Sequence, residues 1–311
     1  MPFFSVIIPL YNKENFIENT LKSVLGQTFD DFEVIIVDDC STDNSLEKIS
    51  ELISSKFRII KHGKNKGLSA SRNTGIKNAN SDYIAFLDAD DIWKNTFLEE
   101  SKLLIDKFPN IKLFGTNYED YYSKDNIILP KNNAKKLEKH SVIADFFAIS
   151  LAQPLYCQSS FCAHKSVFET IGLYNEAITY GEDVDFNIRV NSRFSLAYST
   201  NALVSYTASS ENQITKSRIS EKTITDFDSF ENDQISPSLK KFLDFKRYMM
   251  AKNYRLENNE DAYKKMKQKI DLKNLNYKQR LLLMSPKSGL LFIQKVKSFF
   301  ISKGIRFTTY D

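Results

Sequence analysis

The chain has 311 residues, 42% of them hydrophobic, and a net charge of +4, enough for one large α/β core with an appendage. No apolar run reaches the roughly 18 residues that span a bilayer, and an apolar strand follows the first residues directly, so neither a membrane-spanning nor a secreted protein is expected. Cys40, Cys157 and Cys162 are odd in number and lack metal-type spacing, which indicates free thiols in a reducing compartment and no zinc site.

Two short β-branched runs near the N-terminus, residues 4–9 and 32–37, flank a segment with helical spacing of its apolar residues, 15–25. This pattern predicts a βαβ unit. Because both runs are continuously apolar, we expect strands buried on both faces of a parallel sheet. Asp38 and Asp39 follow the second run directly, and in such sheets ligands bind at the carboxyl ends of the strands.

A third strand is predicted at residues 57–60, followed by a loop that leads into a helix at 65–73. The amides at a helix N-terminus favour anions, and Arg72 offers a forked donor for phosphate oxygens, so this segment could face a diphosphate. Taken singly, Gly67 is better explained as a turn glycine and Arg72 as a surface charge.

A buried strand at residues 83–87 is followed by Asp88, Asp90 and Asp91. Two carboxylates one residue apart suit Mg²⁺ or Mn²⁺, which prefer oxygen ligands and bind through one or two carboxylates together with substrate phosphates. Residues 88–91 are as readily explained as a solvated loop or a helix cap. Further along, Glu182 and Asp183 precede a helical run, where they could simply place negative charge in its first turn.

The middle of the chain carries weaker patterns. We expect a turn and short strand at 124–130, an apolar helix at 142–151 and a strand at 159–164, and we interpret the polar stretch 209–240 as a lid or linker. The three histidines are scattered and are expected in surface or capping positions: His62, His140 and His164.

The C-terminal segment 261–311 is basic. Its twelve Lys and Arg against three Asp give +9, which leaves −5 for the rest of the chain. Apolar clusters at 281–284, 290–293 and 299–301 alternate with lysines, so the segment could lie on an anionic membrane surface. A helical appendage packed on the core, with a solvated basic side, explains the pattern equally well. The apolar interruptions and the lack of a groove-reading motif argue against a nucleic-acid partner.

Five strings in register over roughly the N-terminal third of the chain resemble the family-2 glycosyltransferases of the GT-A fold: 5–12, 23–28, 37–43, 65–73 with Gly75, and 87–93. Residues 172–176 and 180–186 resemble the Glu-Asp motif of the same family. The resemblance implies a Rossmann-like α/β fold with a mixed, mainly parallel sheet flanked by helices and a helical C-terminal appendage. It also implies sugar transfer from a nucleotide-diphosphate sugar, UDP-linked, in the assembly of bacterial cell-surface polysaccharide, lipopolysaccharide or glycolipid.

The same resemblance implies roles for residues of this sequence. Asp183 would be the general base that takes the proton of the acceptor hydroxyl in an inverting displacement. Asp90, with Asp88 close to the sugar nucleotide, would hold Mn²⁺ or Mg²⁺ against the leaving diphosphate. The remaining residues would bind the nucleotide, with Pro9 and Tyr11 lining the base pocket, Asp39 bonding to the base, and Asn65 and Arg72 contacting the nucleotide region. Tyr11 is equally consistent with a packed strand-end aromatic.

The sequence departs from the family in two respects. Some members supply a further metal ligand as a histidine after the base helix, but residues 204–210 contain none, so waters or a hydroxyl would complete the metal shell. The Gln-Xaa-Xaa-Arg-Trp signature of processive synthases is also absent. We therefore expect transfer of a single sugar.

These observations predict a glycosyltransferase domain at 1–215, with a nucleotide-sugar-binding half at 1–120 and an acceptor half at 121–215, and a helical basic region at 216–311. The expected partners are a sugar nucleotide and a glycan or glycolipid acceptor, and the expected location is the cytoplasm or the inner face of the cytoplasmic membrane. Two alternatives remain open: a non-catalytic nucleotide-binding or interaction protein on the same fold, and a metal-dependent phosphotransferase, although such enzymes carry the Asp-Xaa-Asp motif near their first strand.

Overall fold

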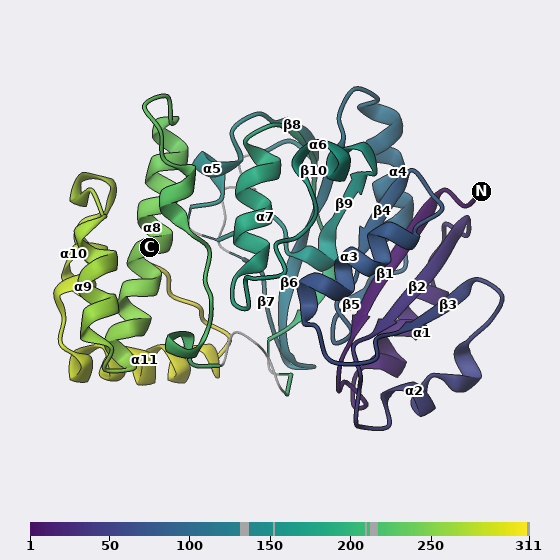
Figure 1. Ribbon diagram of the computed structural model, residues 1–311, viewed down its shortest axis with the longest axis horizontal. Coiled ribbons are helices and arrows are strands. Elements are labelled where there is room, and N and C mark those ends of the chain that lie inside the picture. The colour runs from purple at the N-terminus through teal and green to yellow at the C-terminus, as the bar shows by residue number, and fades with distance from the viewer. Residues whose placement is uncertain (131–136, 152, 209, 212–216, 310–311) are drawn as a thin grey trace.

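The computed structural model describes residues 1–130, 137–151, 153–208, 210–211 and 217–309 (Figure 1). Within these residues, ten strands form one sheet in the order β3-β2-β1-β4-β9-β6-β10-β5, with β7 paired to β6 and β8 to β10. The strands are β1 Phe4–Leu10, β2 Phe32–Asp38, β3 Phe57–Lys61, β4 Tyr83–Phe86, β5 Ile92–Trp93, β6 Leu113–Ser123, β7 Asn126–Ile128, β8 His140–Ile143, β9 Phe161–His164 and β10 Leu196–Thr207.

The sheet is mixed, and its longest registers are parallel. Strand β1 pairs in parallel with β2 and β4, β2 with β3, and β6 with β10. Short antiparallel strands complete it, with β9 lying between β4 and β6. This architecture confirms the predicted α/β fold class, and it brings the carboxyl ends of β1, β2 and β4 to one edge of the sheet.

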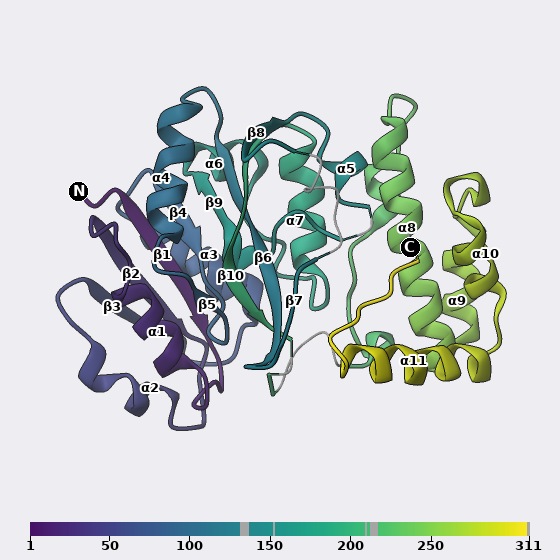
Figure 2. The ribbon, with the colours of Figure 1, turned by 180° about the vertical axis from the view of Figure 1, so that it is seen from behind.

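Helices cover both faces of the sheet and continue beyond it into a C-terminal helical region (Figure 2). They are α1 Ile17–Leu25, α2 Ser45–Lys48, α3 Leu68–Asn78, α4 Phe97–Lys107, α5 Phe146–Ile149, α6 Ser166–Ile171, α7 Glu182–Asn191, α8 Pro237–Leu256, α9 Glu260–Gln268, α10 Tyr277–Met284 and α11 Lys287–Ile301. The last four helices form the predicted C-terminal appendage, which is therefore confirmed.

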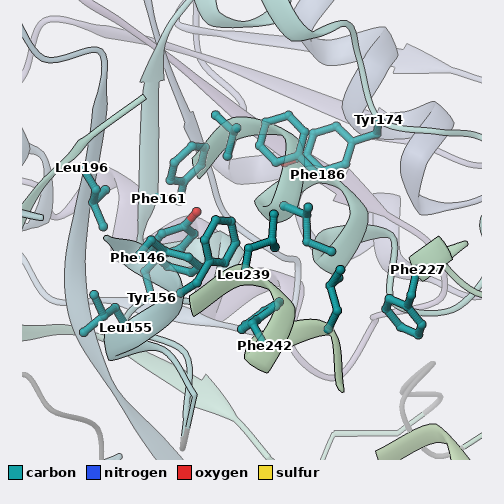
Figure 3. Close-up of a cluster of buried hydrophobic side chains, with 14 of the residues drawn as sticks. Phe146, Leu155, Tyr156, Phe161, Tyr174, Phe186, Leu196, Phe227, Leu239 and Phe242 are labelled. Carbon is teal, nitrogen blue, oxygen red and sulfur yellow. The ribbon is translucent and has the colours of Figure 1, made fainter. Parts of the chain in front are cut away.

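Two apolar cores lie on opposite faces of the sheet, because successive strand residues point to opposite sides. Val6 and Ile8 pack with α1 and α4 in one core, whereas Ile7 packs with α3 and α7 in the other. The second core reaches the C-terminal helices, and Figure 3 shows Phe186 of α7 and Phe242 of α8 in the same cluster. The appendage is thus joined to the sheet by shared apolar packing.

Helix α3 lies unusually close to β1. A Cβ placed on Gly75 would overlap the side chain of Ile7, so only glycine permits this approach. The close packing fixes the position of Arg72, one turn earlier on the same helix.

The apolar stretch 142–151 is not the single helix that was predicted. Val142 and Ile143 belong to β8, which pairs antiparallel with β10, and only Phe146–Ile149 is helical. The Asp145 side chain accepts a hydrogen bond from the Ala148 amide and so begins the short helix α5 at this point. Sheet pairing therefore overrides the helical interpretation.

The interpretation of 209–240 as a lid or linker is wrong for its later part. Ser236 caps α8, Pro237 occupies its first turn, and the helix continues through the end of the stretch. Ile219 and Phe227 are buried in the core that the appendage shares. Residues 209 and 212–216, which include the predicted domain boundary, lie outside the described residues. In the part of the chain that the structure describes, no helix is both long and apolar enough to cross a bilayer.

Candidate active site

The carboxyl ends of three neighbouring parallel strands gather most of the predicted nucleotide-binding residues. Pro9 lies within β1 opposite Val37 of β2, and Tyr11 follows β1 with 44% of its surface exposed. Asp39 follows β2, and Asp88 follows β4. The exposed ring of Tyr11 fits the interpretation of a residue open to a ligand better than that of a packed aromatic.

Asp39 is buried and organises the loop that precedes α3. Its carboxylate accepts hydrogen bonds from the amides of Lys66 and Gly67, at 2.8 and 2.7 Å, and bonds to His62 Nδ1 at 2.6 Å. The amide side chain of Asn65 donates to the Asp39 carbonyl oxygen at 3.3 Å. Asp39 and Asn65 therefore lie together at the end of β2, and their predicted contacts with a nucleotide stay predictions.

The expectation of a surface or capping role fails for His62. This side chain is buried, and its second nitrogen bonds to Thr74 Oγ1 of α3 at 2.9 Å. His62 thus connects Asp39 to the helix that carries Arg72. His164 does have the predicted local role, since its Nδ1 accepts from the amide of Ser166 at the start of α6.

Arg72 joins the two acidic motifs of the chain. Its guanidinium is 2% exposed and donates to Asp88 Oδ1 at 2.8 Å and to Glu182 Oε1 at 3.0 Å. Burial alone would lower the pKa of Arg72, but the charges of Asp88, Tyr174 and Glu182 raise it overall, so the group stays protonated. Arg72 is therefore a buried bridge across the site and not a surface charge, and its contact with a diphosphate stays a prediction.

Asp91 anchors the turn that carries Asp88 and Asp90. Ser159 Oγ donates to one Asp91 oxygen at 2.5 Å, and the Thr207 amide donates to the other at 2.9 Å. Ser159 also accepts from the Asp88 amide at 3.0 Å. Burial, together with the charges of Asp90 and Asp88, raises the pKa of Asp91 well above its usual range. Asp91 therefore holds the turn in place, and sequence reasoning gave no role to it or to Ser159.

The two predicted metal ligands each keep one carboxylate oxygen that bonds to no described residue, Oδ2 of Asp88 and Oδ1 of Asp90. Two such oxygens fit Mg²⁺ or Mn²⁺, which complete their shells with substrate phosphates and water. Among the described residues, no group of three or more His, Cys, Asp or Glu side chains could hold a metal. In the described part of the chain, a cation at this turn would therefore have these two carboxylates as its acidic ligands, and a bound diphosphate would have to supply much of the rest.

Asp90 has a basic neighbour that the sequence did not reveal. Lys13, in the loop after β1, places Nζ 2.7 Å from Asp90 Oδ2 and 2.9 Å from the Glu211 carbonyl oxygen. Ser210 Oγ donates to the same Asp90 oxygen at 2.6 Å. The stretch in which a family histidine was sought therefore does reach the motif, and it does so through a hydroxyl.

The predicted base, Asp183, lies in the first turn of α7, directly after Glu182. Its carboxylate is partly exposed and makes no hydrogen bond or ion pair with any residue that the structure describes. Burial raises the pKa of Tyr180, and the charge of Asp183 raises it further. Asp183 thus has no side-chain partner among the described residues, and the Arg72 bridge connects its neighbour Glu182 to the Asp88 motif.

The C-terminal region contributes a lysine near Asp183. Lys246 of α8 lies with its ammonium 4.8 Å from the centre of the Phe242 ring. Burial lowers the pKa of Lys246, and the charge of Asp183 opposes that effect, so the two groups are close enough to interact. No sequence signal connects these residues, because only the packing of α8 brings them together.

Acidic motifs at strand ends, a buried arginine bridge and a free carboxylate in one site are accompanied by a direct sequence match. The sequence model of Glycosyl transferase family 2 matches residues 5–172. The chain belongs to this family. The membership of this family that the sequence motifs predicted is therefore confirmed.

Several relatives in the family share parts of the sequence. WfgD of Escherichia coli, named as a UDP-Glc:alpha-D-GlcNAc-diphosphoundecaprenol beta-1,3-glucosyltransferase, is 39% identical over 37% of this chain and 45% of its own length. TuaG of Bacillus subtilis (strain 168), described as a teichuronic acid biosynthesis glycosyltransferase, is 42% identical over 32% of this chain and 40% of its own length. An uncharacterized glycosyltransferase of Rickettsia conorii is 37% identical over 62% of this chain and 30% of its own length. The chain thus spans less than half the length of each of these relatives.

A solved structure supports the fold. S. aureus TarS 1–349, in complex with UDP-GlcNAc, superposes with a TM-score of 0.65 at 20% identity and covers 88% of this chain and 82% of that one. The match covers more of the chain than residues 5–172 do, so it extends to the C-terminal helices. The superposition shows that the chain and TarS 1–349 share a fold.

Proposed function

We propose that this chain is an inverting glycosyltransferase that moves one sugar from a UDP sugar to an acceptor hydroxyl in the assembly of a cell-surface glycan. The observation that carries the proposal is the Arg72 bridge, which joins the Asp88 motif to the Glu182–Asp183 motif in one site. The names of WfgD and TuaG support the glycan class, and the UDP-GlcNAc complex of TarS supports a UDP-linked donor.

Different residues of the site would bind the nucleoside and hold the cation. Tyr11, Asp39 and Asn65 would receive the nucleoside at the ends of β1 and β2. Asp88 and Asp90 would hold Mn²⁺ or Mg²⁺, and a bound cation of this kind supplies positive charge for the departing diphosphate. Arg72 keeps Asp88 in position.

Asp183 would take the proton from the acceptor hydroxyl as that oxygen bonds to the sugar carbon. A base and a leaving group on opposite sides of the carbon produce inversion. Glu182 is engaged by Arg72, so Asp183 is the carboxylate of that pair that remains available. The absence of the Gln-Xaa-Xaa-Arg-Trp signature supports transfer of a single sugar.

We further propose that the acceptor is lipid-linked and that the reaction occurs at the inner face of the cytoplasmic membrane. The name of WfgD describes an acceptor on diphosphoundecaprenol. The basic segment 261–311 supports a peripheral contact with anionic lipid. The three free cysteines fit a reducing compartment.

The test is a donor screen on the purified chain. UDP, GDP and dTDP sugars are compared for protection against thermal unfolding and for release of nucleotide with and without Mn²⁺. We expect protection and metal-dependent release with a UDP sugar. Binding without release in the presence of lipid-linked acceptors would instead favour a non-catalytic nucleotide-binding protein on the same fold.

A further inference from the structure

Helix α11 presents a row of exposed apolar side chains. Phe292 and Phe299 are 67% and 61% exposed, and Val296 lies between them on the same face at helical spacing. Leu290, by contrast, is buried in the appendage. Helix α11 is therefore held to the protein by one side, while large apolar groups on the other side have no cover in the described structure.

The same surface carries an unusual charge pattern. No acidic residue occurs between Asp271 and Asp311, whereas this interval holds eight Lys and Arg. Lys295 and Lys303, beside the apolar row, are exposed and form no ion pair within the described residues. Phenylalanines next to unpaired lysines are typical of helices that lie in the headgroup region of anionic bilayers.

The position of α11 relates it to the active site. In Figures 1 and 2, β1 runs from the N-terminus toward the lower edge of the molecule, and α11 lies along that same edge. Because the acidic motifs follow the carboxyl ends of the strands, the site and α11 lie toward the same side of the protein. A surface that touches α11 on this side would therefore also lie toward the strand ends that carry the acidic motifs.

We propose that Phe292, Val296 and Phe299, flanked by Lys295 and Lys303, dock on an anionic lipid surface and hold the active site next to it. This inference rests on the proposed function, because a docked enzyme could reach a lipid-linked acceptor while that acceptor stays in the membrane. A second copy of the chain is a poorer occupant, because two such faces would oppose lysine to lysine.

Vesicle flotation of the full chain tests the proposal. The vesicles contain phosphatidylcholine alone or phosphatidylcholine with phosphatidylglycerol. The test variant is Phe292→Glu with Phe299→Glu. The matched control is Leu25→Glu with Leu103→Glu, which adds the same charge at two residues of α1 and α4 that are each 42% exposed.

We expect the wild type and the control to float with the anionic vesicles, and the test variant to lose binding by about tenfold or more. High salt should weaken binding. In a third variant, Lys295→Gln with Lys303→Gln, binding should also fall. Equal flotation of the test variant, or none by the wild type, would overturn the proposal. The proposal would also be overturned if the wild type were a dimer that binds no lipid and the test variant were a monomer.

Donor binding, measured without vesicles, separates this proposal from the proposed function. The Phe292 and Phe299 substitutions lie outside the site and should leave protection by UDP unchanged. Lipid binding by a chain that ignores every sugar nucleotide would support the docking surface and contradict the transferase. Nucleotide turnover without lipid binding would do the reverse.

Discussion

Lys13 Nζ lies 2.7 Å from Asp90 Oδ2, so the carboxylate proposed to hold a divalent cation already has a positive neighbour. Both side chains are 14% exposed, which limits screening by water. A cation that approaches Asp90 must therefore displace this ammonium or share the carboxylate with it. A diphosphate would favour that exchange, because it supplies negative charge to both cations.

We expect Lys13→Met to bind Mn²⁺ more tightly than the wild type in the absence of nucleotide, by roughly fivefold to tenfold, because a competing charge is removed. Electron paramagnetic resonance titration of free Mn²⁺ measures this directly. Lys22→Met is the control, since Lys22 pairs with Glu18 on the exposed side of α1. Identical Mn²⁺ affinity for both variants would show that Lys13 does not compete for the site.

Arg72→Met should destabilise the protein by about 3–5 kcal/mol, because it leaves Glu182 and Asp88 without their shared partner. Urea unfolding measures the change. Arg58→Met is the comparison, since the side chain of Arg58 is 43% exposed where it pairs with Glu33, and the change should cost under about 1 kcal/mol. Adding Glu182→Gln to Arg72→Met should restore part of the loss. An unfolding curve unchanged by Arg72→Met would contradict the bridge.

Asp183→Asn should lower sugar transfer by about 10²–10⁴-fold, the usual contribution of a general base, while UDP binding is kept. Transfer is followed as UDP release in the presence of acceptor, and binding by calorimetry. Asp185→Asn is the control in the same turn of α7, because Asp185 pairs with Arg189 and not with the site. Full activity in Asp183→Asn would remove this residue as the base.

The parts of the site that depend on local sequence patterns could be predicted from the sequence. Strands β1, β2 and β4 are continuous apolar runs that end in polar residues, and parallel pairing then brings Tyr11, Asp39 and Asp88 to one edge. Helix α3 also begins where a glycine precedes the predicted helix.

Contacts between distant segments could not be predicted in the same way. The partners of Arg72 and Lys13 depend on how α7 and the loop after β1 pack against the Asp88 turn, which no local pattern encodes. The apolar stretch that contains Val142 is too short for periodicity to separate helix from strand, and pairing with β10 decided the outcome. The position of Lys246 near Asp183 likewise requires the packing of α8.

A pH dependence of stability should arise from Lys252 of α8. Burial, with a smaller contribution from Lys297, lowers the pKa of Lys252 from 10.5 to about 8. Between these values the unfolded chain binds more protons than the folded one, so the free energy of unfolding should rise as pH increases from about 8 to about 10.5. Below pH 8 the cost of charging the partly buried amine of Lys252 is present in full.

The free energy of unfolding of Lys252→Met should therefore exceed that of the wild type by about 1–2 kcal/mol near neutral pH. The variant should also lack the increase in this free energy with pH that Lys252 causes in the wild type. Urea unfolding at a series of pH values measures both effects. Lys264→Met, on the exposed side of α9, is the control and should keep the wild-type dependence. If the free energy of unfolding changes with pH in the same way in the Lys252 and Lys264 variants, the amine of Lys252 does not cause the pH dependence of stability.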